Sequence, residues 1–127
     1  NMNMVKATVN ADVTQLAAAG FSVPVPQRWR DGVKAHAGRE VLLGVRPEHV
    51  GEAAAHDWNA TAPLGGSIEI VETIGHEVIV HFRCGDDMVI AKLGAHRIPQ
   101  FNEQVSLVLN CDAIHLFDPQ TEQRLPG

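Results

Sequence analysis

The stretch that decides the fold is residues 67–93, which read SIEIVETIGHEVIVHFRCGDDMVIAKL. It contains three runs rich in β-branched residues: Ser67 to Glu72, Val78 to Arg83 and Met88 to Leu93. Short runs of this kind, separated by turn residues, are typical of strands. Cys84-Gly85-Asp86-Asp87 separates the last two runs, and Gly85 can adopt the positive φ of a hairpin turn. The stretch therefore predicts antiparallel strands joined by short turns.

The short-period pattern continues on both sides of this stretch. Apolar runs predict five further strands: Val5 to Val9, Phe21 to Val25, Glu40 to Val45, Gln104 to Leu109 and Ile114 to Phe117. Because proline cannot donate to a strand ladder, Pro24 and Pro26 place the second of these at a sheet edge. Arg46-Pro47 ends the third run, and Asp118-Pro119 predicts a turn after the last.

One segment has a helical spacing. Between Gln27 and Gly38 the apolar residues recur at every fourth position: Trp29, Val33 and Ala37. This spacing predicts a short helix that Gly38 ends. Gly51 to Gly66 shows no period and is expected to be a loop with one helical turn through Glu52 to Ala55. We therefore predict an all-β fold, a barrel or sandwich with one short helix.

The composition limits the classes of protein. With 127 residues, 45% of them apolar, residues 1–127 are expected to form one domain that folds without a disulfide or metal. The net charge of −5 argues against nucleic acid as a partner. No apolar run approaches the roughly 20 residues of a membrane span, and the first residues show no secretory signal, so we expect a cytosolic chain. Cys84 and Cys111 are expected to be reduced, half-buried thiols within strands.

The sequence offers little catalytic chemistry. His76-Glu77 begins like a zinc-protease HExxH motif, but Val80 stands where the second histidine belongs. The other histidines lack ligand spacing, so we predict no metal site. Gly65-Gly66-Ser67 lacks the final glycine of a nucleophile elbow, and no phosphate-binding or dinucleotide-binding glycine loop occurs. We expect no catalytic residue and no cofactor in this chain.

Two polar clusters follow apolar strands. Gly44 to His49 contains Arg46, whose planar guanidinium suits a carboxylate or phosphate, and Glu48, which could pair with it. The alternative is a solvated strand end, since surface ion pairs contribute little. The second cluster is Ile114 to Asp118, in which Leu116 and Phe117 are expected in the core and Asp118 begins a turn.

These segments, in this order, resemble the C-terminal regulatory domain of the ATP-hydrolysing subunit of ABC importers, in the maltose and glycerol-3-phosphate uptake branch. The matching segments are Leu43 to His49 (LGVRPEH), Val71-Glu72 through Gly75-His76-Glu77, and His115 to Asp118 (HLFD) with Thr121, Arg124 and Leu125. Met2-Asn3-Met4 resembles the stretch where the ATPase domain hands over to this one. The resemblance covers nearly the whole chain and departs chiefly in Gly51 to Gly66.

The resemblance implies a transport-associated OB-type (TOBE) β-barrel, which agrees with the strand count. It implies that residues 1–127 are a C-terminal regulatory domain and that the sites for ATP and magnesium lie in an upstream ATPase domain; a chain opening on Asn1 fits a cut piece. The implied partners are a second copy of the subunit, that ATPase domain, the membrane permease subunits indirectly, and a cytosolic regulatory protein. The implied location is the cytoplasmic side of the inner membrane.

In this family reading, pairing of two copies keeps the ATPase halves at a high effective concentration when they separate. Arg46, Glu48 and His49 are expected at the pairing surface or the ATPase contact, whereas Gly75 and Glu77 are read first as turn residues. The residues expected at interface or regulatory contacts are Arg46, Pro47, Glu48, His49, Gly75, Glu77, His115, Phe117 and Asp118.

Two other functions remain open at this point. The chain could be a sensor of a small oxyanion or sugar in another class of ABC importer. It could also be an independent oligonucleotide-binding OB barrel, but such barrels use a basic groove and stacking aromatic residues. This chain has a net charge of −5 and no tyrosine. The transported solute is not determined by the sequence.

Overall fold

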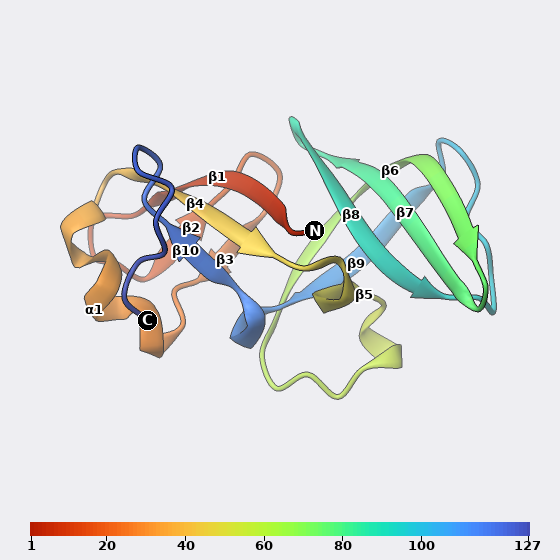
Figure 1. The fold of residues 1–127 in the computed structure, drawn as a ribbon, viewed down its shortest axis with the longest axis horizontal. Coiled ribbons are helices and arrows are strands. Elements are labelled where there is room, and N and C mark those ends of the chain that lie inside the picture. The colour runs from red at the N-terminus through yellow and green to blue at the C-terminus, as the bar shows by residue number, and fades with distance from the viewer.

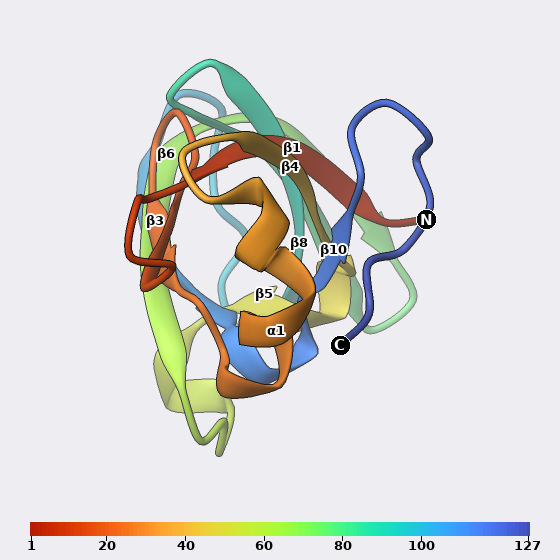
Figure 2. The ribbon, with the colours of Figure 1, turned by 90° about the vertical axis from the view of Figure 1, so that its left-hand side faces the viewer.

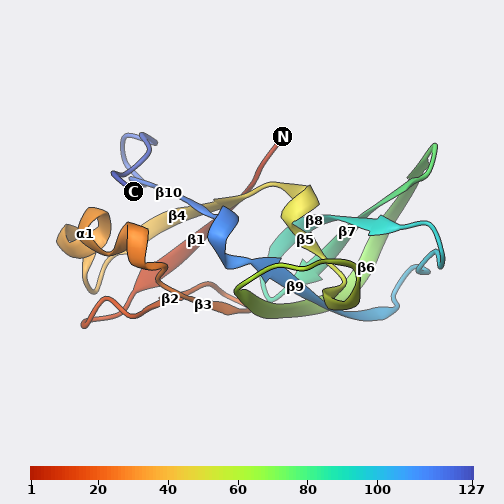
Figure 3. The ribbon, with the colours of Figure 1, turned by 90° about the horizontal axis from the view of Figure 1, so that it is seen from below.

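The computed structural model describes all residues 1–127 as two five-stranded antiparallel sheets that lie side by side along the long axis (Figures 1 and 3). The first sheet has the strand order β10-β4-β1-β2-β3 and consists of β1 (Asn3–Val9), β2 (Gln15–Ala17), β3 (Ser22–Pro24), β4 (Glu40–Val45) and β10 (His115–Phe117). The second has the order β5-β9-β6-β7-β8 and consists of β5 (Val50–Gly51), β6 (Thr61–Ile74), β7 (Glu77–Cys84), β8 (Asp87–Gly94) and β9 (Gln104–Asn110). The predicted all-β class is confirmed.

The one α-helix is short and lies over the end of the first sheet that faces the viewer in Figure 2. It is the middle of a continuous helical segment made of η1 (Gln27–Trp29), α1 (Arg30–Val33) and η2 (Lys34–His36). Trp29 and Val33 are buried as predicted, but Ala37 is exposed because the helical segment ends before it, and Gly38 follows with φ +73°. Single 3₁₀ turns form η3 (Pro47–His49), η4 (Ala53–Ala55) and η5 (Cys111–Ala113). No helical segment has the length and apolar character to cross a bilayer.

The turn and edge predictions are confirmed. β3, which contains Pro24, is the last strand of its sheet. Gly85, with φ +61°, lies in the hairpin between β7 and β8, where Cys84 is paired with Asp87. β4 has the predicted bounds, and Arg46-Pro47 follows it directly.

The predicted loop from Gly51 to Gly66 is wrong in its second half. β6 begins at Thr61, pairs with β9 over 61–67 and then with β7 over 67–74. Gly66 lies at this change of partner, where a Cβ atom would overlap the carbonyl oxygen of Arg83. The glycines that suggested a loop therefore let a long strand pass close to a neighbouring backbone.

The sequence reading also missed two short strands and misplaced a cysteine. β2 and β5 consist of three and two residues, too few to show a period. Cys111 lies in η5 and not in a strand, and both thiols are buried and unpaired rather than half-buried. Burial raises the pKa of both Cys84 and Cys111 above the usual thiol value.

The two sheets share one hydrophobic core of 28 buried residues. The side chain of Asn3, at the start of β1, links this strand to the edge strand β8. Its amide nitrogen donates to the carbonyl oxygen of Ile90 (2.9 Å), and its oxygen accepts from the Ile90 N–H (2.8 Å). Asn3 is only 7% exposed, so these bonds satisfy buried polar groups of both strands.

We expect Asn3→Ala to lower the free energy of unfolding by about 1–3 kcal/mol, because it leaves two backbone groups of Ile90 without partners. Urea unfolding followed by circular dichroism measures the change. Asn59→Ala, at an exposed residue, serves as the control and is expected to stay within about 0.5 kcal/mol. An equally small effect of Asn3→Ala would show that the amide bridge does not hold the sheets together.

Candidate functional site

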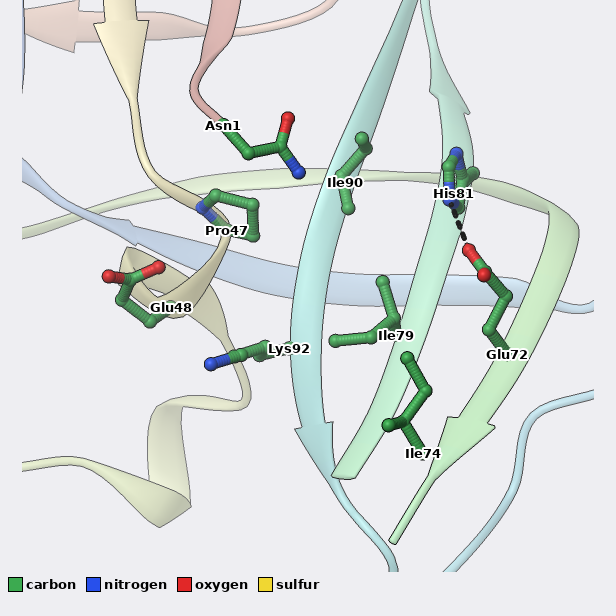
Figure 4. Close-up of a pocket in the computed structure, with 9 residues that line it drawn as sticks. All are labelled: Asn1, Pro47, Glu48, Glu72, Ile74, Ile79, His81, Ile90 and Lys92. Carbon is green, nitrogen blue, oxygen red and sulfur yellow. Dashed lines mark hydrogen bonds and ion pairs between the residues drawn. The ribbon is translucent and has the colours of Figure 1, made fainter. Parts of the chain in front are cut away.

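The most pronounced surface hollow is a groove of about 420 Å³ between η3 and the outer face of β6, β7 and β8. Figure 4 shows Pro47 and Glu48 on one side and the side chains of the three strands on the other. The lining residues, which define the β6–β8 groove, are Asn1, Pro47, Glu48, Glu72, Ile74, Ile79, His81, Ile90 and Lys92. The fold thus brings the first two predicted motifs, Leu43 to His49 and Val71 to Glu77, to one place.

The apolar part of the groove continues onto the outer face of the three strands. A β-bulge between Ile68 and Ile70 shifts the register of β6 against β7, so that Ile68 is buried while Ile70 is 48% exposed. Beyond the bulge Ile74 is 60% exposed, and Ile79 and Ile90 are half-buried. A row of isoleucines on a solvent-facing sheet surface is typical of a contact surface.

Charged residues on this face form pairs across neighbouring strands. Glu69 is paired with Arg83 (2.8 Å) and Glu77 with Lys92 (2.9 Å), and Glu72 is hydrogen-bonded to His81 (3.0 Å), which carries a charge only when it is protonated. Lys92 also lies in the field of Glu48 across the groove. Its pKa is raised, chiefly by the hydrogen bond to Glu77 and the field of that carboxylate, with a smaller contribution from Glu48. Two of the three strand carboxylates are therefore offset by a cation.

The motif Arg46 to His49 does not act as a unit. Arg46 and Glu48 are both exposed and form no ion pair with each other, which contradicts the suggested pairing. The turn of η3 separates them: Pro47 is buried and Glu48 lines the groove, whereas the charge of Arg46 acts on His115 of β10. His49 is half-buried, with its Nδ1 3.5 Å from the side-chain nitrogen of Asn110.

The turn residues of the predicted set occupy the positions expected from their types. Gly75, with φ +60°, connects β6 to β7, and Glu77 opens β7. Asp118 accepts hydrogen bonds from the backbone N–H groups of Gln120 (2.8 Å) and Thr121 (3.1 Å), and these bonds lower its pKa. Asp118 thus stabilises the turn after β10.

His115 and Phe117 lie in β10, which is paired with β4, and neither residue lines the groove. Both are half-buried, so of the expected core pair Leu116 and Phe117 only Leu116 is fully buried. The Nδ1 atom of His115 is 3.4 Å from Nε of Arg124. Burial lowers the pKa of His115, and the charges of Arg124, Arg28, Arg46 and His49 lower it further.

The residue types that bind metal ions are scattered over this structure. No three His, Cys, Asp or Glu side chains come together in an arrangement that could hold a metal ion. The seven histidines are spread over separate strands, turns and loops. What the groove provides is an apolar surface with charged residues of both signs, which suits a polypeptide contact.

Sequence reasoning missed most of the strand residues that line the groove. Ile79, His81, Ile90 and Lys92 come from runs that were correctly predicted as strands, whereas Ile74 lies beyond Glu72, the predicted end of its run. Alternation shows which residues share a face, but the bulge at Ile68 to Ile70 decides which isoleucines face solvent. No local pattern revealed that bulge.

The comparisons with known proteins cover nearly the whole chain. A model described as "MalK OB fold domain" matches residues 1–50, and one described as "TOBE domain" matches residues 43–117. The chain is 34% identical over 98% of its length to the sulfoquinovosyl glycerol transport ATP-binding protein SmoE of Agrobacterium fabrum, covering 33% of that protein. It is 31% identical over 99% of its length to the sn-glycerol-3-phosphate import ATP-binding protein UgpC of Bordetella pertussis, covering 34% of it.

The chain thus spans about a third of the length of these relatives. A solved structure of the cytoplasmic molybdate-binding protein ModG has the same fold, with a TM-score of 0.71 and 17% identity over 92% of this chain and 96% of that one. At this identity the likeness concerns the fold alone. The TOBE model covers more than half of the chain, and the curated relatives are ATP-binding subunits of ABC transporters; the chain therefore belongs to the TOBE domain family.

Proposed function

We propose that this chain is the regulatory and dimerisation domain of the ATP-binding subunit of an ABC importer for sugars or for sugar and glycerol phosphates. Relatives of this type match 96–99% of the chain, and the chain makes up about a third of each. In this proposal ATP and magnesium bind in an upstream ATPase domain, and the subunit lies on the cytoplasmic side of the membrane against its permease subunits.

The dimerisation role rests on the isoleucine face next to the β6–β8 groove, which consists of Ile70, Ile74, Ile79 and Ile90. The chain has a net charge of −5, so two copies repel each other over most of their surface. On this face Arg83 and Lys92 offset Glu69 and Glu77, so the repulsion is reduced where apolar area is available. Charges of both signs on one patch are also what a self-complementary twofold contact requires. We therefore assign a second copy of the chain to this face.

Pairing through this face would couple two ATPase domains. When ATP is absent and the ATPase domains separate, a contact between their appended domains keeps them at a high effective concentration. A regulatory protein that bound the paired and separated states unequally would then alter the ATPase equilibrium. Pro47 and Glu48 lie at the rim of the groove and closely follow β4, so this contact lies next to the end of β4.

Ile74→Lys is the sharpest test of the pairing surface. Because it places an ammonium group in the apolar contact, we expect the dissociation constant of self-association to rise at least about tenfold. Sedimentation equilibrium over a range of chain concentrations measures it. Ile98→Lys is the matched control, since Ile98 is 52% exposed and lies outside the groove and the three strands.

A chain that stays monomeric at every concentration, or two variants that weaken association equally, would contradict the pairing surface. The ATP-binding assignment has a separate test. The reading frame upstream of the codon for Asn1 is expected to encode a phosphate-binding loop followed by an ABC signature. An open frame without them would refute that part of the proposal.

A further inference from the structure

A second surface, on the β10 side of the first sheet, gathers positive charge in an acidic chain. β10 is paired with β4 so that His115 lies opposite Gly44. Arg46, two residues beyond Gly44, is therefore a diagonal neighbour of His115 on the same face of the sheet. Arg124 approaches His115 from the C-terminal segment through the 3.4 Å contact of its Nε atom. Arg28 approaches the residue before it, donating to the carbonyl oxygen of Ile114 (2.8 Å).

None of these three arginines has a carboxylate partner. All three are exposed, and none forms a salt bridge, whereas Arg83 of β7 and Arg97 of the loop after β8 are paired with Glu69 and Glu103. Three guanidinium groups around one histidine repel one another, and no salt bridge within the chain offsets that repulsion. An incoming anion would do so.

The arginines are also held in place. The guanidinium carbons of Arg28 and Arg124 lie 5.1 Å and 4.9 Å from the ring centroid of the buried Trp29, at cation–π distance. Arg28 is fixed further by its bond to the carbonyl oxygen of Asp112 (3.0 Å). Side chains ordered in the free protein lose less entropy on binding, which favours recognition.

The shape of this surface selects the occupant. A guanidinium fork binds carboxylates and phosphates alike. Small-molecule sites, however, are concave and enclose most of their ligand. None of the five main surface hollows contains two of these arginines. Arg28 lines one open hollow of about 330 Å³, together with Asp31, Gly32, Pro126 and Gly127. An open patch with separated cations fits an extended polypeptide.

We infer that Arg28, Arg46 and Arg124, gathered around His115, form a docking patch for a carboxylate-rich polypeptide segment. The patch lies on the first sheet and is independent of self-association through the β6–β8 groove. It gives the domain a second contact surface. This surface is positively charged, whereas the isoleucine face carries charges of both signs.

The test uses a synthetic peptide of ten glutamates, titrated into the chain by isothermal calorimetry in about 0.1 M sodium chloride, where the Debye length is roughly 10 Å. The net charge of −5 opposes this peptide, so binding would require a local positive site. Each single Arg→Gln change at 28, 46 or 124 is expected to raise the dissociation constant about threefold to fivefold, and the triple variant on the order of a hundredfold. Binding should vanish in about 1 M sodium chloride, where the Debye length is roughly 3 Å.

A charge-matched triple variant separates the patch from net charge. Arg39→Gln, Arg83→Gln and Arg97→Gln together remove three positive charges elsewhere. They are expected to leave binding within about twofold, because exposed charges more than a Debye length from the contact are largely screened. Arg46→Lys should restore most of the affinity that Arg46→Gln loses. The ring protons of His115, followed by NMR, provide a local readout: the peptide should raise the pKa of His115 by offsetting the arginine charges.

Three results would overturn the inference. The peptide fails to bind, the two triple variants weaken binding equally, or inorganic phosphate alone binds as tightly as the peptide and shifts His115 to the same extent. The last result would reassign the patch to small oxyanions. Circular dichroism of each variant confirms that it is folded before its affinity is compared.

Discussion

Trp29→Ala is expected to lower the free energy of unfolding of the whole chain by about 3–5 kcal/mol. Trp29 is fully buried and is the largest fully buried side chain. Its removal leaves a cavity against the first sheet and takes away the ring on which Arg28 and Arg124 lie. Because the two sheets share one core, we expect the loss to appear in both.

The second tryptophan provides the measurement. Trp58 lies in the loop before β6, and its ring is stacked on that of His56 with 3.8 Å between the ring centroids. Its fluorescence therefore reports on the second sheet. In urea, Trp58 fluorescence and far-UV circular dichroism should shift together to lower concentration. Trp29→Phe is the control: it keeps most of the apolar volume and removes an indole N–H that has no hydrogen-bond partner, so its cost should stay below about 1.5 kcal/mol. An unchanged Trp58 transition in Trp29→Ala would contradict the shared core.

Phe82→Ala tests the same coupling from the other side, with an expected loss of about 3–5 kcal/mol. Phe82 is fully buried in β7, where it is paired with Ile68 on one side and Val89 on the other. In a Trp58→Phe background, fluorescence comes from Trp29 alone and reports on the first sheet. We expect that signal to shift with the circular dichroism.

The control for Phe82 is Phe101→Ala, because Phe101 is 73% exposed and its loss should change stability by no more than about 0.5 kcal/mol. If the Trp29 transition kept its midpoint in Phe82→Ala while part of the circular dichroism signal was lost earlier, the two sheets would unfold separately. The prediction that residues 1–127 form one domain would then be wrong.

The fold was predictable where one local pattern dominated. β4 follows from a continuous apolar run before Arg46-Pro47, and the hairpin of β7 and β8 follows from Gly85 between two β-branched runs. β6 was predicted too short, because Pro63, Gly65 and Gly66 lower strand propensity. Its pairing with β9 and then β7 supplies the hydrogen bonds that outweigh this propensity.

The candidate sites were less predictable because they join segments far apart in sequence. The motif around Arg46 and the motif around Glu72 were both found from the sequence. The sequence did not show that Glu48 lines the same groove as Glu72, or that Arg46 lies near His115. Arg28 and Arg124 come from opposite ends of the chain and meet only because Trp29 lies between the helical segment and the C-terminal residues.

By itself, the sequence determined the strand-rich class, the main turns and the family, since these depend on alternation, turn chemistry and short motifs that lie within a few residues of each other. Only the tertiary structure decided which isoleucines face solvent and which arginines lack a partner. The bulge in β6 inverts one strand face, and the pairing of β10 with β4 sets Arg46 beside His115. Both depend on hydrogen bonding between distant strands, which no local pattern encodes.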